Sequence, residues 1–193
     1  MSAAGFALAG GASSRMGRDK ALLPWSGGDL LGHTLDRLRE VVPEVRILAG
    51  SERRYLERGF PVDTDAAPGL GPIAGLLAGL EAVAGRAALL LAIDLPLVPA
   101  ALLSRLLGLA AAFDAVVPVS PRGPEPLCAL YGPGCLPALR RRVKAGDLRM
   151  TGFWPDVRVR RLEAEEIAVF GPPERLFLNV NAPEDYAAAA GPL

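Results

Sequence analysis

Apolar residues follow two alternating patterns along this chain: short uninterrupted runs, and stripes with helical spacing. In the segment 29–42 apolar residues recur three or four positions apart, for example at Leu31, Leu35 and Leu38. This spacing predicts one buried face of a helix. Residues 87–93 instead form an uninterrupted apolar run, which is typical of a parallel strand covered on both faces.

The two patterns alternate from one end of the sequence to the other, which predicts a doubly wound α/β fold. In this fold a mostly parallel sheet carries helices on both faces. The chain has 193 residues, and we expect a single domain over residues 1–193. The predicted strands cover residues 5–9, 44–49, 61–65, 87–93, 115–119, 127–131 and 157–162. The predicted helices cover residues 29–42, 53–58, 72–84, 100–113, 136–145 and 183–190.

Composition excludes several classes of protein. There is no charge-free apolar run of about 18 residues, so we expect no membrane span. The N-terminus lacks a basic region before its apolar stretch, so we expect no secretory signal and a cytoplasmic location. The net charge is zero, from 21 basic and 21 acidic residues, which argues against nucleic-acid binding through a basic face. Cys128, Cys135 and His33 are too few ligands for a structural zinc site.

The segment 8–20, Leu-Ala-Gly-Gly-Ala-Ser-Ser-Arg-Met-Gly-Arg-Asp-Lys, follows the first predicted strand. Its three glycines let backbone N–H groups approach an anion, because no Cβ intervenes. We therefore predict that this loop binds phosphate groups. The spacing is neither that of a Walker A motif nor that of a Rossmann fingerprint. Three cationic side chains accompany the glycines: Arg15, Arg18 and Lys20.

Two aspartates follow predicted strands. Asp94 comes directly after the run 87–93, at the edge of the sheet where open α/β sheets bind ligands. Its carboxylate is the type of ligand that Mg²⁺ prefers, although a turn or helix-capping role would also suit an aspartate there. Asp65 closes the third predicted strand and could accept two hydrogen bonds from guanine N1–H and N2–H₂. Neighbouring Asp63 could take the same role.

Two asparagines precede the last predicted helix. Asn181 suits the cap of that helix, because Pro183 would stand near its first position. Asn179 points the same way as Asn181 if residues 177–180 are extended. Two amides on one face could bind a polar pterin or a phosphate group.

These segments together resemble the nucleotidyltransferases that attach a nucleotide to a phosphorylated acceptor. The loop 8–20 is similar to their L-A-G-G-x-x-x-R-M-G-x-D-K signature, and residues 71–75 to their Gly-Pro-Leu-Ala-Gly segment. Asp94-Leu-Pro96 resembles an Asp-x-Pro motif, and residues 179–185 resemble a closing Asn-x-Asn-x-Pro-Glu-Asp motif. In having two adjacent glycines at this place, the loop resembles that of the molybdenum cofactor guanylyltransferases, the MobA type. Related cytidylyltransferases more usually have Ala-Gly there.

The resemblance implies transfer of GMP from GTP to the terminal phosphate of molybdopterin, with release of pyrophosphate. It implies Mg²⁺ as cofactor, and proteins that deliver and accept the molybdenum cofactor as partners; we expect a monomer. The catalytic residues implied are Arg15, Lys20 and Asp94, with Asp94 as the metal ligand. The nucleotide-binding residues implied are Leu8, Ala9, Gly10, Gly11, Lys20, Asp65 and Asp94. The acceptor-binding residues implied are Asn179 and Asn181.

One departure and three alternatives accompany this interpretation. Leu48-Ala49-Gly50 stands where the family has an asparagine. Cytidylyl transfer to molybdopterin, or to another small phosphorylated acceptor, would use the same loop. Residues 69–74 fit G-x-G-x-x-A, and Asp94 follows about 20 residues later, as in NAD(P)-dependent oxidoreductases. However, they follow the third strand rather than the first. A nucleotide-binding module without catalysis is the third alternative, against which Asp94, Arg15 and Lys20 argue.

Overall fold

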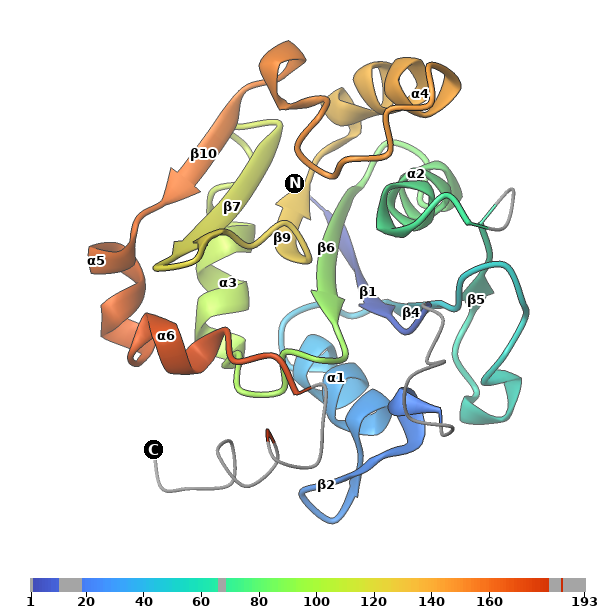
Figure 1. Cartoon of the computed structure of the whole chain (residues 1–193), viewed down its shortest axis with the longest axis vertical. Coiled ribbons are helices and arrows are strands. Elements are labelled where there is room, and N and C mark those ends of the chain that lie inside the picture. The colour runs from blue at the N-terminus through green and yellow to red at the C-terminus, as the bar shows by residue number, and fades with distance from the viewer. Residues whose placement is uncertain (1, 11–18, 66–68, 181–184, 186–193) are drawn as a thin grey trace.

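An eight-stranded sheet forms the centre of the protein (Figure 1). The computed structural model describes residues 2–10, 19–65, 69–180 and 185. The strands of the sheet are β1 (Ala3–Leu8), β4 (Val45–Leu48), β5 (Val62–Asp63), β6 (Ala87–Ala92), β7 (Ala115–Ser120), β8 (Gly123–Pro124), β9 (Cys128–Tyr131) and β10 (Val159–Leu162). Their order is β10-β7-β9-β6-β1-β4-β5, and β8 pairs with β7.

Most neighbouring strands run in parallel. β1 pairs in parallel with both β4 and β6, β4 with β5, and β7 with β10. β9 is the exception among the long strands, because it runs antiparallel to β6 and β7. The carboxyl ends of β1, β4, β5 and β6 therefore meet at one edge of the sheet, and β9 begins at that same edge.

Helices cover both faces of the sheet, so the predicted doubly wound α/β fold is confirmed. On one face, α1 (Leu30–Arg39) packs against β1 and against α3 (Ala100–Gly108). On the other face, α2 (Pro72–Ala82) packs against β6 and against α4 (Leu136–Lys144). Figure 1 shows α2 and α4 together on the near side of the sheet.

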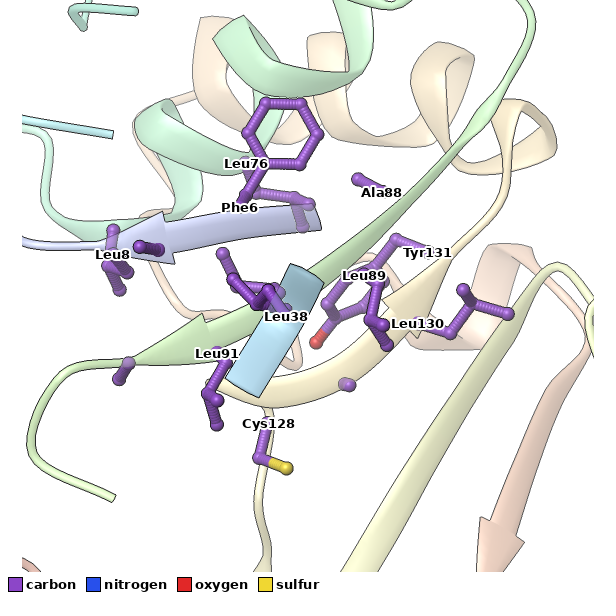
Figure 2. Packing of buried hydrophobic residues seen from close by; sticks show 14 of the residues in the cluster. Phe6, Leu8, Leu38, Leu76, Ala88, Leu89, Leu91, Cys128, Leu130 and Tyr131 are labelled. Atoms are coloured by element: carbon purple, nitrogen blue, oxygen red, sulfur yellow. The ribbon is translucent and has the colours of Figure 1, made fainter. Parts of the chain in front are cut away.

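Successive side chains of β1 point to opposite faces of the sheet, so this one strand packs against the helices on both faces. Gly5 faces α1, where a Cβ would lie 3.2 Å from Leu38 Cβ. Phe6 points the opposite way, toward α2 (Figure 2). Its ring fits there because Gly79 has no side chain; a Cβ on Gly79 would lie 3.1 Å from Phe6 Cε1. Every residue of β1 and β6 is buried, as expected for strands covered on both faces.

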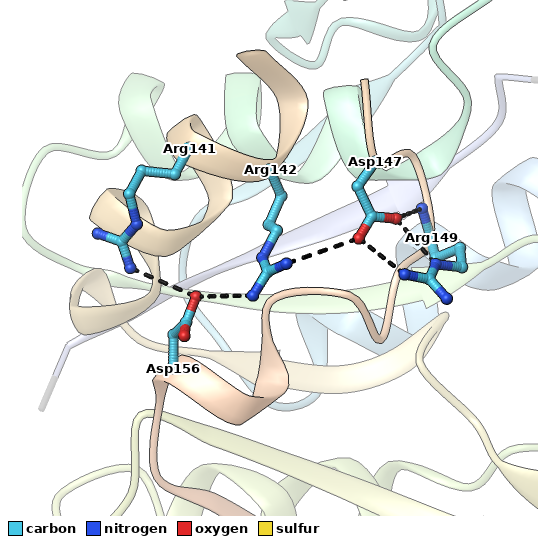
Figure 3. A network of polar contacts seen from close by, with 5 residues as sticks. All are labelled: Arg141, Arg142, Asp147, Arg149 and Asp156. Atoms are coloured by element: carbon cyan, nitrogen blue, oxygen red, sulfur yellow. Dashed lines mark hydrogen bonds and ion pairs between the residues drawn. The ribbon is translucent and has the colours of Figure 1, made fainter. Parts of the chain in front are cut away.

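The basic helix α4 carries arginines that are paired with carboxylates (Figure 3). Arg142 lies between two of them, 3.1 Å from Asp156 and 3.9 Å from Asp147. Arg149 also pairs with Asp147 at 2.9 Å and lowers the pKa of that carboxyl to about 2. α4 follows the end of β9, so this network lies beyond the edge of the sheet opposite the carboxyl ends of β1 and β6.

Some predicted elements are shorter in the structure than predicted. The helix predicted over 100–113 ends at Gly108, because glycine is a weak helix former and the chain then turns through i to i−3 hydrogen bonds. The helix predicted over 53–58 shrinks to a 3-10 turn at Leu56–Arg58, since Tyr55 takes a left-handed conformation. Residues 177–180, whose extension would place Asn179 and Asn181 on one face, start with a turn, because the N–H of Phe177 bonds to the carbonyl of Pro173.

Several short elements were not predicted. β2 (Pro24–Trp25) and β3 (Gly28–Asp29) form a hairpin whose turn residues, Ser26 and Gly27, both have positive φ. Two short helices follow β10: α5 (Ala164–Ile167) and α6 (Pro173–Leu176). The predicted helix 183–190 lies outside the described residues, apart from residue 185. In the ranges given above, no helix has the length and apolar character to cross a membrane.

Candidate active site

The segments that leave β1, β4, β5 and β6 stay side by side beyond the strand ends. The N–H of Ala9 donates to the carbonyl of Leu48 over 2.9 Å, and the N–H of Asp65 donates to the carbonyl of Gly50 over 2.8 Å. The N–H of Ile93 likewise donates to the carbonyl of Leu8. The predicted site residues that follow these strands are therefore brought to one edge.

A cavity of about 560 Å³ opens at this edge, between the ends of β1, β4 and β5 and the start of α2. Much of its wall is glycine backbone. Gly10 and Gly50, which follow the neighbouring strands β1 and β4, pack closely in this wall, since a Cβ on Gly10 would lie 2.7 Å from Gly50 N. The lining residues are Leu8, Gly10, Ala49, Gly50, Ser51, Glu52, Arg54, Asp65, Gly69, Gly71, Pro72 and Gly75.

Asp65 presents its carboxylate to the cavity against the first turns of α2. A Cβ on Gly75 would lie 3.3 Å from Asp65 Oδ1, so the glycine makes room for the carboxylate. Burial raises the pKa of Asp65, and its side chain has no hydrogen-bond partner within the described ranges. Asp63 is placed differently: Arg46 binds both of its oxygens at 2.7 Å. Of the two aspartates, only Asp65 lines the cavity and has oxygens available to a ligand.

We expect Asp65→Asn to raise the melting temperature of the ligand-free protein at neutral pH. The raised pKa means that ionised Asp65 costs free energy in the folded state, and the cost is present above that pKa. Because solvent still reaches the side chain, the gain should be about 1 kcal/mol or less. It should shrink as the pH falls through the raised pKa toward 3.8, the ordinary value. Thermal melts across this pH range provide the measurement.

Asp63→Asn is the matched control, because it removes the same charge from a carboxylate that forms an ion pair with Arg46. It should lower the melting temperature. An Asp65→Asn protein that melts at or below the wild-type temperature at neutral pH would contradict the expected cost of the buried charge.

Lys20 and Asp94 meet at this edge through an ion pair of 3.1 Å. Asp94 comes from the end of β6, and Lys20 begins the 3-10 turn Lys20–Leu22. Asp19 caps that turn by accepting a hydrogen bond from the N–H of Ala21. The hydroxyl of Tyr55 donates to Asp19 at 2.8 Å. Tyr55 and Asp19, for which the sequence predicts no role in the site, thus fix the turn that carries Lys20.

The turn that carries Asp94 is also held from both sides. His33 Nε2 lies 2.9 Å from the carbonyl of Pro96, which can only accept, so this ring nitrogen carries the proton. The carbonyl of Asp94 accepts a hydrogen bond of 2.9 Å from the N–H of Val180. This bond brings partly exposed Asn179, which precedes Val180, to the same edge as Asp94.

The Asp94 site suits a metal ion that substrate phosphates help to bind. Asp94 keeps 26% of its side chain exposed beside the cationic Lys20. Among the described residues no group of three or more His, Cys, Asp or Glu side chains could hold a metal ion alone. Mg²⁺ is typically bound by one or two carboxylates plus phosphate oxygens and water. A single carboxylate at an open edge of the sheet, as at Asp94, is consistent with this mode of Mg²⁺ binding.

Asn179 lies at the edge beside Asp94, and the other predicted site residues fall into four groups. Leu8, Gly10 and Asp65 line the cavity, and Lys20 pairs with Asp94. Ala9 lies beside the cavity without lining it, with its N–H used in the sheet. The remaining predicted residues lie outside the described ranges and stay predictions: Gly11, Arg15 and Asn181.

The two cysteines take no part in the site. Cys128 and Cys135 are both free and buried. Burial raises the pKa of the Cys135 thiol to about 12 and also raises that of Cys128. Both thiols therefore remain protonated, as expected for small buried apolar side chains.

Comparison with known proteins gives consistent similarities. Residues 5–154 match the family model of the MobA-like NTP transferase domain. A Shewanella baltica protein named molybdenum cofactor guanylyltransferase is 34% identical over 182 residues, 92% of this chain and 90% of that protein. A Pelotomaculum thermopropionicum protein named "Probable molybdenum cofactor guanylyltransferase" is 33% identical over 98% of this chain and 92% of that protein.

A solved structure is similar over almost the whole chain. It is the molybdopterin-guanine dinucleotide biosynthesis protein A of Archaeoglobus fulgidus, with a TM-score of 0.80 and 26% sequence identity. The similarity covers 98% of this chain and 96% of that one.

Proposed function

Because the chain belongs to the MobA-like NTP transferase family, we propose that it transfers GMP from GTP to the terminal phosphate of molybdopterin. The product is molybdopterin guanine dinucleotide, and pyrophosphate is released. We also propose that residues 1–193 act as a single domain. Membership of this family excludes the oxidoreductase alternative, and the glycines at 69 and 71 that suggested it instead line the cavity.

The observation that carries the proposal is the order of groups along one sheet edge. From β5 to β6 the strand ends present first Asp65, then Gly10, then the Lys20–Asp94 pair, and Asn179 follows beside Asp94. In this order Asp65 would accept from the base, the backbone at Gly10 would face the phosphates, Lys20 would supply a cation, and Asn179 would lie on the acceptor side.

The reaction is a direct displacement at phosphorus. An oxygen of the acceptor's terminal phosphate forms a bond to the α-phosphorus of GTP, and the bond between the α-phosphorus and the bridging oxygen breaks. Pyrophosphate leaves with that bonding electron pair. The protein does little covalent chemistry in such a reaction, so positioning and charge neutralisation provide the catalysis.

Each residue contributes to one of these two tasks. Lys20, and by expectation Arg15, would offset charge on the triphosphate, while Asp65 would hold the base and Asn179 and Asn181 would hold the acceptor. Asp94 would hold a divalent ion, Mg²⁺ in our proposal, which when bound would supply positive charge beside the leaving pyrophosphate. Nucleotide phosphates would compete with Asp94 for the ammonium group of Lys20.

Base choice tests the proposal. We expect GTP to outcompete CTP, ATP and UTP in pyrophosphate release with molybdopterin as acceptor. Ionised Asp65 can accept two donors from guanine, whereas an asparagine leaves that pairing incomplete. Asp65→Asn should therefore reduce the preference for GTP by about tenfold or more, with a smaller loss of turnover on the preferred nucleotide.

Asp63→Asn serves as the control, because it removes a neighbouring carboxylate that does not line the cavity. Its base preference should match that of the wild type. A wild-type protein that prefers CTP would overturn guanylyl transfer in favour of cytidylyl transfer. An Asp65→Asn protein with full GTP preference would remove Asp65 from base recognition.

A further inference from the structure

Arg54 is the only cationic side chain among the described residues that line the cavity. It lies in the loop between β4 and the 3-10 turn Leu56–Arg58. A third of its side chain is exposed, 33%. The proposed mechanism gives it no role.

The Arg54 guanidinium stacks over the Tyr55 ring, with Cζ 5.2 Å from the ring centroid, and its hydrogen bonds to described residues are incomplete. Its Nη2 lies 3.5 Å from the carbonyl of Ala9 and 3.4 Å from that of Ala49, and Nη1 lies 3.4 Å from Asp19 Oδ2. All three distances are at the long end of the range for hydrogen bonds. Its buried Nε meets no acceptor in the described part of the chain. A guanidinium carries five N–H donors, so this one retains the capacity to bind an anion.

The position of Arg54 along the edge of the sheet identifies the part of a ligand it would meet. It reaches the ends of β4 and β1 through the carbonyls of Ala49 and Ala9. On one side, beyond β4, stands Asp65 at the end of β5. On the other side its partner Asp19 directly precedes Lys20, which binds Asp94 at the end of β6. Arg54 therefore lies between the base-binding carboxylate and the cation of the proposed phosphate site.

A nucleotide that spans these two points passes its ribose and inner phosphates over Arg54. The residues at the end of β4, Ala49 and Gly50, have no polar side chains. Ser51 and Glu52 follow them in the cavity wall, and Arg54 is the cation among the described lining residues of this segment. An ion pair with Asp19 at 3.4 Å is readily exchanged for stronger contacts with phosphate, because guanidinium and phosphate match in charge and geometry.

We infer that Arg54 is a nucleotide-binding residue that holds the ribose–phosphate part of the nucleotide whatever its base. The inference rests on the proposed function in that the cavity binds a nucleotide. It assigns Arg54 and Asp65 different tasks: Arg54 sets the affinity for every nucleoside triphosphate, and Asp65 sets the choice among them.

Binding measurements on Arg54→Ala test this inference. Isothermal titration with GTP, CTP and ATP should show Kd values raised by about tenfold or more, by a similar factor for all three. In turnover assays KM for the nucleotide should rise, while KM for molybdopterin stays near the wild-type value. Arg54→Lys should recover part of the affinity only, because lysine keeps the charge and loses the planar fork.

Arg53→Ala is the matched control, since Arg53 is an adjacent exposed arginine that does not line the cavity. It should bind nucleotides as the wild type does. If Arg54→Ala does not fold, Arg54→Gln provides the same comparison with more of the side-chain volume kept. Thermal melts of every variant separate a loss of binding from a loss of folding.

Two results would overturn the inference. One is a folded Arg54→Ala or Arg54→Gln protein with wild-type affinity for all three nucleotides. The other is a loss confined to GTP, which would make Arg54 part of base recognition. A wild-type preference for CTP would end the guanylyl proposal and leave the Arg54 inference standing, because the expected loss is the same for every base.

Discussion

Asp94→Ala should lower kcat for nucleotidyl transfer by roughly 100- to 1000-fold, the range seen when one group that stabilises transition-state charge is removed. The variant loses the carboxylate that we propose for the divalent ion. It should nevertheless fold, since the Asp94 side chain is partly exposed and, within the described ranges, pairs with Lys20 alone. Such partly solvated ion pairs typically contribute about 1 kcal/mol or less to stability. The hydrogen bond from Val180 to the Asp94 carbonyl is made by backbone and would remain.

Pyrophosphate release under saturating GTP, with a thermal melt of the same preparation, provides the measurement. Asp36→Ala is a suitable control, because Asp36 is an exposed carboxylate on α1, paired only weakly with Arg39. It should leave turnover unchanged. An Asp94→Ala protein with turnover within tenfold of the wild type would remove Asp94 from the chemistry.

Lys20→Ala should lower turnover by more than about tenfold, because it removes a positive charge from the proposed site of the triphosphate. Arg15→Ala should do the same if the loop 8–20 binds phosphates. The Lys20 variant also frees Asp94 from its partner, so the two residues act on a shared set of charges. The double variant Lys20→Ala/Asp94→Ala should consequently lose less activity than the product of the two single losses.

Single-turnover kinetics of the three variants would measure this coupling. Normal turnover in both Lys20→Ala and Arg15→Ala would mean that the loop is a structural turn. Fully multiplicative losses in the double variant would mean that Lys20 and Asp94 act independently, although they are in contact.

Much of the fold follows from the sequence because its strands are buried on both faces. Such strands require apolar residues at every position. The apolar run 87–93 therefore predicts a buried strand more clearly than any other element. The hairpin β2–β3 left no such signal, because its strands are two residues long and its turn depends on the positive φ of Ser26 and Gly27. The helix predicted over 53–58 is shortened because Tyr55 takes a left-handed backbone conformation. The amino-acid sequence around Tyr55 does not predict this conformation.

The candidate site was predictable where it follows strand ends and obscure where it depends on tertiary contacts. Asp94 follows the buried strand β6 and Asp65 follows β5, so the topology alone brings them to the same edge. The choice between Asp65 and Asp63 needed the position of Arg46, 17 residues away from Asp63 in the sequence. Arg54 carries no local signal, because its place in the cavity comes from contacts with residues of other segments.

The reversed direction of β9 has a consequence for how such a protein could acquire new acceptors. In a fully parallel sheet only the segments that leave strands reach this edge, and each must lead on into a crossover. Here the segment that enters β9 arrives there as well: the N–H of Ala92 bonds to the carbonyl of Leu127, and Arg122 bonds to the carbonyl of Phe177. A loop between two adjacent antiparallel strands can lengthen or shorten at little cost. Evolution could therefore remodel the wall beside the proposed acceptor site through residues 121–127, which include the short strand β8, while the proposed nucleotide side stays unchanged.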